Sequence, residues 1–234
     1  MGAIPIEEEI AGWTAFGVLA FTSGRKHGDF RLSGTTAADD GAAWQDLLAA
    51  LAATADRLVV ARQVHGRDIL VHASTAWRGF RIVETGADGH FTTERGTAMA
   101  VTVADCVPVF IAHPSGAVAV LHSGWRSTAA GIAASAVDVF REKGLAARDL
   151  KVHLGPAICE WCYRVGADVL EVLTGARSAE GCVDLRGILV RQFREAGVRT
   201  ITVSELCTRC DNDRFFSHRA GDSGRQVGII VVPK

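Results

Sequence analysis

Residues 98–121 read AMAVTVADCVPVFIAHPSGAVAVL, and this stretch decides the fold. Three apolar runs of strand length lie in it, separated by Asp105-Cys106 and by a Pro-Ser-Gly turn. Because the runs lack polar alternation, they are typical of strands that are buried on both faces. The sequence therefore predicts buried strands at 98–104, 107–112 and 117–121, with Pro108 at a sheet edge or a bulge.

The Pro-Ser-Gly turn determines which residues face each other in the predicted hairpin. If the turn is a three-residue loop, His113 pairs with Ala117 and Cys106 lies opposite Gly124. His122 is then the diagonal neighbour of Cys106 on the same face, and such neighbours lie about 7–8 Å apart at Cα. We therefore expect the thiol and the imidazole to reach a common point.

The flanking sequence predicts a mixture of strands and helices. Residues 58–64 read as a strand and 68–72 as its hairpin partner, with His65 and Gly66 in the turn region. Caps and periodicity predict three helices: one over 42–53 with Asp39 or Asp40 as its cap, one from Ser127 or Thr128 to Lys143, and one over 184–196. Short strands are expected at 200–203 and 227–232. Since no regular βαβ rhythm emerges, we expect an α+β (mixed α/β) fold in one domain over 1–234, with mixed sheets packed against flanking helices.

The overall composition narrows the class of protein. The chain has 234 residues, 48% of them hydrophobic, and a formal net charge of -1, so it lacks the basic footprint of a nucleic-acid-binding protein. No apolar run is long enough to span a bilayer, and the acidic residues 1–10 lack the basic region of a secretory signal. We expect a cytoplasmic protein without a membrane or nucleic-acid partner, whose six cysteines stay reduced.

Three residues suggest one metal ion. His65, Cys106 and His122 each lie where an apolar segment ends or begins. Two imidazoles and a thiolate suit zinc, and with a weak axial ligand they also suit copper. Three protein ligands leave a fourth position open, as in catalytic zinc sites. Alternatively, Cys106 is a small buried hydrophobe and the histidines are incidental, and the spacing leaves both interpretations open.

The residues after His122 favour an anion site. A helix is expected to begin within a few residues, and helix N-termini attract phosphate. Ser123, Gly124 and Arg126 crowd this turn, and a guanidinium can hold phosphate with its planar fork. The alternative is ordinary capping by the serines and an ordinary salt bridge for Arg126.

A second polar cluster, Ser217-His218-Arg219, lies near the C-terminus. It suits a loop over a substrate, or simply a polar loop before the last strand.

Four of the six cysteines form two CxxC pairs, Cys159/Cys162 and Cys207/Cys210. Together they could make a Cys₄ zinc site, although the stretch between the pairs exceeds the usual spacing of zinc ribbons. A redox disulfide is a further alternative. We favour the plain interpretation that these are buried thiols.

Five short motifs carry a family resemblance. They are QVHG at 63–66, ADCVP at 104–108, HSGWR at 122–126, GPAI at 155–158 and FFSHR at 215–219. In this order they closely resemble the YfiH/YlmD family, whose members are described as laccase-like polyphenol oxidases, peptidoglycan editing factors and purine nucleoside phosphorylases. The resemblance implies a YfiH-like fold of mixed sheets between helices, and a monomer.

The resemblance also implies roles for particular residues. It makes His65, Cys106 and His122 the ligands of a zinc ion and places the 217–219 cluster beside the active site. Arg25, within TSGRKHGD at 22–29, takes the place of an arginine that the family carries in its N-terminal motif.

The activity that the resemblance implies is zinc-dependent phosphorolysis of a purine nucleoside. Inorganic phosphate would attack the anomeric carbon of adenosine, inosine or S-methyl-5'-thioadenosine through an oxocarbenium-like transition state, which gives the free base and ribose 1-phosphate. The family is also credited with adenosine deamination, for which zinc activation of water is one route. Asp105, beside Cys106, is a candidate for proton transfer, or else a buried carboxylate that supports a ligand.

Three alternatives from other classes stay open. A copper-dependent, laccase-like phenol oxidase would use the same three ligands, but the chain has no His-x-His pair of the kind that multicopper oxidases use. A cysteine hydrolase with a cell-wall role would use Cys106 as nucleophile and His122 as base. A zinc-stabilised interaction module would have a closed four-ligand site and no turnover.

Overall fold

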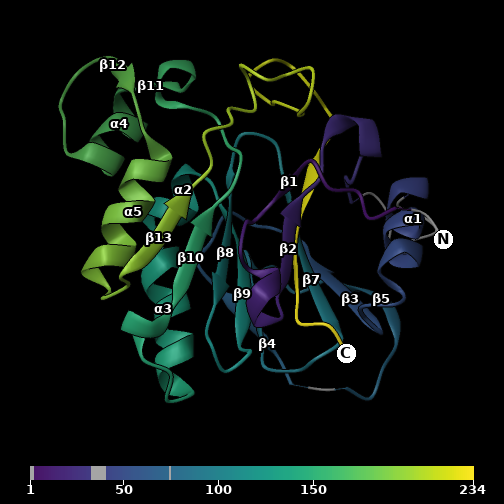
Figure 1. The fold of residues 1–234 in the computed structure, drawn as a ribbon. Helices are drawn as coiled ribbons and strands as arrows, with labels where there is room; N and C mark the ends of the chain where they lie inside the picture. Colours follow the sequence, from purple (N-terminus) through teal and green to yellow (C-terminus); the bar gives the residue numbers. More distant parts are fainter. Residues whose placement is uncertain (1–2, 33–40, 74) are drawn as a thin grey trace.

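The computed structural model describes residues 3–32, 41–73 and 75–234. Two six-stranded sheets stack face to face, and helices cover the outer face of each (Figure 1). This arrangement confirms the predicted class, a mixed α/β fold with mixed sheets and flanking helices. None of the described helices is both long enough and apolar enough to cross a membrane.

The first sheet combines antiparallel and parallel pairs in the order β1-β2-β14-β7-β3-β5. Strand β14 is antiparallel to β2 and β7, whereas β3 is parallel to β7 and β5. The six strands are β1 (Glu8–Glu9), β2 (Leu19–Thr22), β14 (Gln226–Val231), β7 (Thr97–Val103), β3 (Arg57–Ala61) and β5 (Gly79–Val83).

The second sheet has the order β13-β10-β8-β9-β6-β4 and contains the predicted hairpin. Its strands are β13 (Thr200–Val203), β10 (Lys151–Leu154), β8 (Val107–Ala112), β9 (Val118–Ser123), β6 (Gly89–Thr92) and β4 (Ile69–His72). His113 N donates to Ala117 O at 2.9 Å and Pro108 lies opposite His122, which confirms the predicted register. The prediction of an edge or bulge at Pro108 is wrong, because β8 lies between β9 and β10. The proline is tolerated because it lies just beyond the last residue pair with β10.

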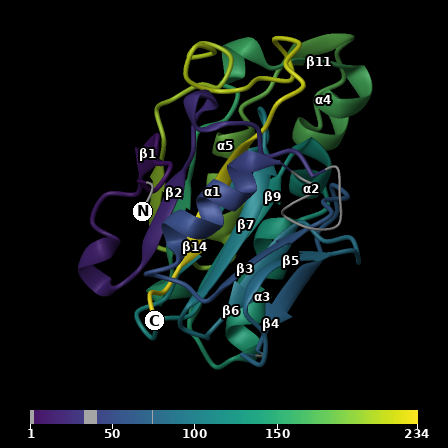
Figure 2. The same ribbon diagram turned by 90° about the vertical axis from the view of Figure 1, so that its right-hand side faces the viewer.

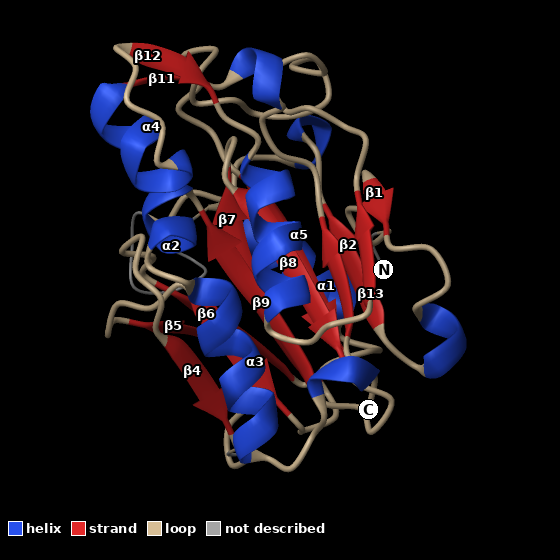
Figure 3. Ribbon diagram, turned by 90° about the vertical axis from the view of Figure 1, so that its left-hand side faces the viewer, coloured by secondary structure: helices blue, strands red, loops and turns tan. Residues whose placement is uncertain are grey.

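Five α-helices flank the sheets in the described residues. Helix α1 (Ala42–Leu51) covers the first sheet (Figure 2), and α3 (Ile132–Glu142) and α5 (Leu185–Glu195) cover the second (Figure 3). The others are α2 (Trp125–Ala129) and α4 (Ala167–Thr174), beside a small sheet of β11 (Arg164–Gly166) and β12 (Glu180–Cys182). Short 3-10 turns occur at Thr14–Phe16, Arg25–His27, Ala147–Asp149 and Glu160–Cys162.

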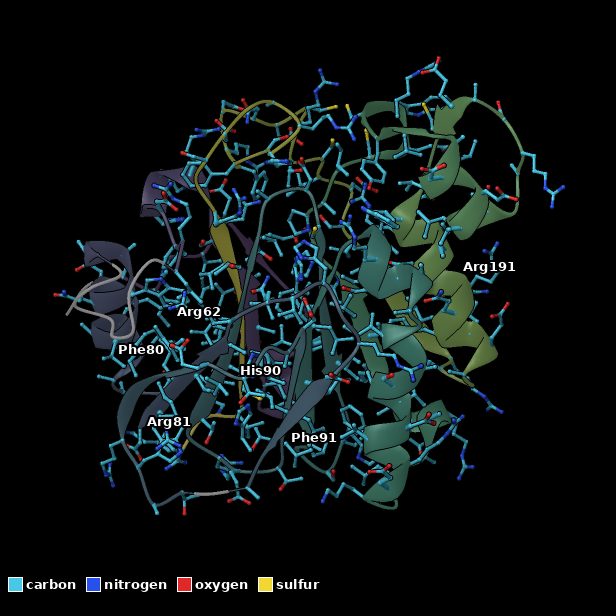
Figure 4. The ribbon with its side chains drawn as sticks, turned by 180° about the vertical axis from the view of Figure 1, so that it is seen from behind. Arg62, Phe80, Arg81, His90, Phe91 and Arg191 are labelled. Atoms are coloured by element: carbon cyan, nitrogen blue, oxygen red, sulfur yellow. The ribbon has the colours of Figure 1, made fainter. Side chains whose placement is uncertain are left out.

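The core follows from strand alternation, because successive side chains point to opposite faces of a sheet. In β7, Met99 and Val101 face the second sheet, whereas Ala98 and Ala100 face α1. In the second sheet, Phe91 of β6 contacts α3, where its ring meets Phe140 edge-on with centroids 4.9 Å apart (Figure 4). Both sheets are therefore buried on two faces, as the continuous apolar runs predict.

Two predicted elements are wrong. Strands β3 and β4 do not form a hairpin, because β3 pairs with β5 and β7 in the first sheet and β4 pairs with β6 in the second. The segment with His65 is therefore a crossover between sheets. The helix expected from Ser127 or Thr128 to Lys143 is two helices, α2 and α3, separated by Gly131 at φ 81°.

The predicted caps and ends of the other helices can also be compared with the structure. Helix α2 begins after Gly124 without a side-chain cap, so the predicted capping by Ser127 or Thr128 is wrong. The predicted caps Asp39 and Asp40 lie outside the described residues; α1 begins after Gly41. Helix α5 is one residue shorter at each end than predicted, and its N-cap Asp184 accepts a hydrogen bond from Gly187 N at 2.9 Å.

Candidate metal centre and cavity

Cys106 lies in the tight connection between β7 and β8, where the chain passes from the first sheet to the second. Asp105 has a φ of 81°, a left-handed conformation that Asp tolerates better than most residues. This turn interrupts the strand alternation at Asp105 and Cys106. The argument that adjacent strand residues must face opposite ways therefore does not apply to this pair.

His65 reaches the same place on the crossover from β3 to β4. The Gln63 side chain anchors this crossover: its amide nitrogen donates to Thr102 O at 2.8 Å, and its oxygen accepts from Thr102 N at 2.7 Å. His65 itself has a φ of 58°, a sparsely populated conformation outside glycine and a few polar residues. The hydrogen bonds between Gln63 and Thr102 fix the crossover and so hold His65 in this conformation.

Asp88 holds two of the candidate ligands. Its Oδ1 lies 2.7 Å from Nδ1 of His122 and accepts from His65 N at 3.0 Å. Its Oδ2 accepts from Gly66 N at 2.6 Å and Val64 N at 3.2 Å. A carboxylate that accepts from Nδ1 leaves Nε2 of His122 as the free ligand nitrogen, an arrangement common in metal sites.

The three candidate ligands converge. One ligand atom from each of His65, Cys106 and His122 lies within 4.8 Å of the other two, and the imidazole centroids are 4.8 Å apart at 84°. Position 124 favours glycine, because a Cβ there would lie 2.8 Å from the Cys106 sulfur and the sulfur would have to shift. The donor set fits a zinc or copper ion. Since His122 is buried and His65 is exposed, one side of the site is open to solvent.

The electrostatics of the trio favour a thiolate. Burial raises the pKa of Cys106, but its histidine neighbours outweigh this and lower it to about 6. Burial lowers the pKa of His122, but the Cys106 sulfur and Asp88 raise it to about 9. For Asp88, hydrogen bonds from His122 and Gly66 overcome burial, so the pKa of its carboxyl is lowered. The site is therefore prepared to present a thiolate ligand at neutral pH.

A cavity of about 270 Å³ opens above the trio, close to the lower end of the range of about 300–1,000 Å³ for small-molecule sites. Its lining residues are His65, Ala104, Asp105, Cys106, Gly124, Trp125, Arg126, Ile158, Tyr163, Leu185, His218 and Arg219. A wider hollow of about 430 Å³ lies against α1, but neither metal-ligating group of the described residues borders it. The metal-ligating side chains, rather than the cavity volume, therefore identify the smaller cavity as the candidate site.

Two arginines supply positive charge to the cavity. The Arg126 guanidinium lies 4.2 Å from the centroid of the Trp125 ring, and within the described chain it forms no ion pair. Arg219 donates to Arg164 O at 2.7 Å and lies over the Tyr163 ring at 5.3 Å. The salt-bridge alternative for Arg126 therefore receives no support.

Asp105 fixes the loop that carries Arg219. Its Oδ1 accepts from the Thr208 hydroxyl at 2.7 Å, and its Oδ2 accepts from Arg219 N at 2.7 Å. The carboxylate thus connects the β7–β8 turn to the long loop before β14. The yellow part of that loop arches over the top of the molecule in Figure 1.

The structure separates the predicted site residues into two sets. Seven border the cavity: His65, Asp105, Cys106, Gly124, Arg126, His218 and Arg219. His122 lies behind them as a ligand. Ser123, Ser217 and Arg25 are not among the lining residues.

The three residues that do not line the cavity have structural contacts. The Ser123 hydroxyl pairs with that of Thr128 at 3.0 Å, and the Ser217 hydroxyl accepts from Ala220 N at 3.1 Å. Arg25 forms a salt bridge with Asp222 at 2.6 Å and donates to Phe215 O. These contacts shape the turn and the loop around the cavity.

Five cavity residues, Ala104 among them, and Asp88 are not predicted as site residues from the sequence. Trp125, Ile158 and Tyr163 fall inside or beside quoted motifs, but apolar and aromatic residues there are read first as core. Burial raises the pKa of Tyr163 to about 12, so its hydroxyl stays a hydrogen-bond donor. Leu185 and Asp88 belong to no motif, and only their place in the fold identifies them.

The two CxxC pairs also converge, in a second group apart from the trio. They are not uniformly buried: Cys207 is buried, Cys159 and Cys162 are partly exposed, and Cys210 is exposed. The prediction of plain buried thiols is therefore wrong, because their segments are loops at the surface.

The fold and site together define a two-sheet α/β protein with a candidate His₂Cys metal centre below a small cationic cavity. The family model described as "Multi-copper polyphenol oxidoreductase laccase" matches residues 34–233, and the chain belongs to this family. The resemblance to YfiH/YlmD proteins that the sequence motifs indicate is thereby confirmed.

Relatives and solved structures agree with this assignment. Purine nucleoside phosphorylase YlmD of Geobacillus stearothermophilus is 37% identical over 202 residues, which are 77% of this chain and 74% of the relative. The crystal structure of that YlmD has a TM-score of 0.82 with 31% identity and covers 93% of both chains. Adenosine deaminase RL5, from an unknown prokaryotic organism, is 32% identical over 184 residues, 70% of each chain.

Proposed function

We propose that this protein is a zinc-dependent purine nucleoside phosphorylase. Its substrates are adenosine, inosine or S-methyl-5'-thioadenosine together with inorganic phosphate, and its products are the free base and ribose 1-phosphate. The observation that carries the proposal is the convergence of His65, Cys106 and His122 at a cavity that contains two arginines. The name of the relative from Geobacillus stearothermophilus supports the reaction class.

Phosphate binds through Arg126 and Arg219 in this proposal. Charge-assisted hydrogen bonds from guanidinium groups are the strongest available to a phosphate, and their planar geometry orients it for attack. Arg219 is pre-positioned, because its backbone donates to Asp105 and its side chain to Arg164 O. Arg126 is the freer of the two and can turn toward the ligand.

The purine lies against the aromatic wall of the cavity. Trp125 and Tyr163 offer ring surface, and the Tyr163 hydroxyl and the His218 ring offer polar contacts to base nitrogens or ribose hydroxyls. Holding the nucleoside and the phosphate together converts a bimolecular attack into an effectively intramolecular one.

A zinc ion held by His65, Cys106 and His122 would supply Lewis-acid polarisation of a substrate oxygen. Asp88 keeps the ring of His122 in the ligating orientation. Asp105 is our candidate for proton transfer to the departing base. Its two oxygens have four acceptor sites, so contacts with Thr208 and Arg219 leave room for a proton.

The relative named adenosine deaminase supports a second activity at the same centre. We infer that adenosine bound with C6 toward the trio would react with water, which forms a C6–O bond and releases the amino group as ammonia to give inosine. The experiment is a panel of adenosine, inosine and S-methyl-5'-thioadenosine with and without phosphate, with chromatography of bases and nucleosides. Phosphate-dependent release of free base by the wild type, lost in Cys106→Ala together with the metal ion of the His₂Cys centre, is the expected result. Unchanged base release and metal content in Cys106→Ala would refute it.

One observation favours a cysteine hydrolase as the second candidate. Asp88, His122 and Cys106 stand in the order of an Asp-His-Cys triad, with a thiolate favoured by its surroundings. A thiol reagent that labels Cys106 equally with and without bound zinc would support this candidate over ligation. Protection by zinc would support the metal centre.

The family's description as a multi-copper polyphenol oxidoreductase makes a copper oxidase the third candidate. The described residues contain one group with histidine ligands, whereas multicopper oxidation of phenols draws on several copper ions. Oxygen uptake with a phenol, measured per bound copper, separates this activity from base release.

A further inference from the structure

A second group of ligand-forming side chains lies outside the cavity. Cys159 and Cys162 come from the loop after β10, and Cys207 and Cys210 begin the long loop between β13 and β14. The four sulfur atoms lie within 4.8 Å of one another, and those of Cys162 and Cys210 are 3.5 Å apart. None of the four borders the cavity.

Backbone contacts hold the two loops in this arrangement. Ala157 and Cys207 form an isolated parallel bridge, and Thr208 N donates to Ala157 O at 3.2 Å. The bridge sets the two CxxC pairs side by side, so the long stretch of sequence between them is no obstacle. The unusual spacing reflects the intervening β11, α4, β12, α5 and β13.

The sulfur of Cys207 already accepts hydrogen bonds from backbone N–H groups. Cys159 N lies 3.2 Å and Cys210 N 3.4 Å from it. Donors aimed at a sulfur stabilise negative charge on it, and the thiolate is the form that binds metal. This arrangement supports ligation more directly than proximity alone.

We propose that Cys159, Cys162, Cys207 and Cys210 bind one zinc ion in a closed tetrahedral site. Zn–S bonds of about 2.3 Å place sulfur atoms about 3.8 Å apart in a regular tetrahedron, and the observed distances, 3.5 Å for Cys162–Cys210 and at most 4.8 Å for the other pairs, bracket this value. A disulfide needs about 2.05 Å and joins only two of the four. With all four positions filled by protein, the ion is structural.

The ion would cross-link the two loops that carry residues of the candidate active site. The first CxxC loop lies between Ile158 and Tyr163, which both border the cavity. The second loop carries Thr208, which donates to Asp105, and continues to His218 and Arg219. A cross-link here fixes a loop that has no helix or strand between 204 and 225. The effect on substrate binding rests on the proposed function; the metal site itself does not.

The test is zinc content per chain after purification under reducing, oxygen-free conditions. We expect two zinc ions in the wild type, one in Cys210→Ser and one in Cys106→Ala. Cys182→Ser is the matched control and keeps two, because Cys182 lies outside both groups. The Cys106→Ala variant leaves the Cys₄ group untouched, so the result does not depend on how Cys210→Ser folds.

Cobalt loading identifies the ligands. Co²⁺ bound by Cys106→Ala is expected to show the intense thiolate-to-cobalt absorption of a four-sulfur site, and Cys106→Ala with Cys210→Ser is expected to lose it. A Cys106→Ala protein that binds neither zinc nor cobalt would overturn the proposal. So would iron in place of zinc, or a Cys162–Cys210 disulfide found by mass spectrometry in the reduced preparation.

Discussion

The Oδ1 oxygen of Asp88 lies 2.7 Å from Nδ1 of His122, and both residues are buried. Asp88 also accepts from the backbone of His65, so one carboxylate orients two candidate ligands that are 57 positions apart. Removing it disturbs a metal site without touching any ligand atom.

We therefore predict that Asp88→Asn weakens zinc binding by about 10–100-fold, the range for loss of a partner behind a ligating histidine. The new amide presents a donor where backbone N–H groups already point. Zinc affinity is measured by competition with a chelator, with circular dichroism as a check on folding. Asp138→Asn, on the exposed face of α3, is the control and should keep wild-type affinity. Equal affinities in the two variants would contradict the role of Asp88.

Gly124 leaves space for the metal centre. A Cβ at this position would lie 2.8 Å from the Cys106 sulfur and 3.4 Å from Cδ2 of His65. We expect Gly124→Ala to lose base release together with the zinc ion of the His₂Cys centre, because the Cys106 thiolate must shift. Gly166→Ala is the matched control, since a Cβ there meets nothing within 4 Å and the φ of -75° suits alanine. Full zinc content in Gly124→Ala would show that the sulfur can move without loss of ligation.

In the zinc-free protein, alkylation of Cys106 should depend on pH in a distinctive way. A pKa lowered to about 6 means that the thiolate is formed above that pH and lost below it. The alkylation rate should therefore be near its plateau at neutral pH, whereas a free thiol with a pKa of about 8.5 is still mostly protonated. Peptide mass spectrometry follows Cys106 alone, and zinc should suppress the labelling. A midpoint near that of a free thiol would show that the histidines do not stabilise the thiolate.

We expect Arg126 to contribute more to the binding of phosphate than to the binding of the nucleoside. We predict that Arg126→Ala raises the KM for phosphate by about 10–100-fold, the equivalent of one or two charge-assisted hydrogen bonds. The KM for the nucleoside should change much less. Arg191→Ala removes an exposed arginine of α5, outside the cavity, and serves as the control (Figure 4). If the two arginine variants show the same phosphate dependence, Arg126 does not bind phosphate.

Local signals made part of this structure predictable. The turn at 114–116 specifies the register of β8 and β9, and through it the approach of Cys106 to His122. The ends of α5 were predictable because Asp184 and Gly197 are a cap and a stop at the right separation.

Long-range relationships were not predictable from local signals. An apolar run does not specify which strand it pairs with. The sequence therefore predicts a hairpin of β3 and β4, although these strands lie in different sheets. Asp88 contacts residues at 64–66 and at 122, and no motif contains it. The two CxxC pairs meet through a single parallel bridge, Ala157 to Cys207, that leaves no periodic trace in the sequence.

Asp105→Asn tests the proposed proton donor. Asparagine tolerates the φ of 81°, and its oxygen can accept from Arg219 N while its amide donates to the Thr208 hydroxyl, but it cannot carry a proton to the leaving base. We predict a fall in kcat of roughly 10²–10⁴-fold, the usual contribution of a general acid. Thr208→Val removes a contact of the Asp105 carboxylate but leaves the carboxyl group itself in place, so the kcat of this variant should stay near the wild-type value. A rise in the KM for phosphate with kcat unchanged would instead assign Asp105 a positioning role through Arg219, whose backbone it holds at 2.7 Å.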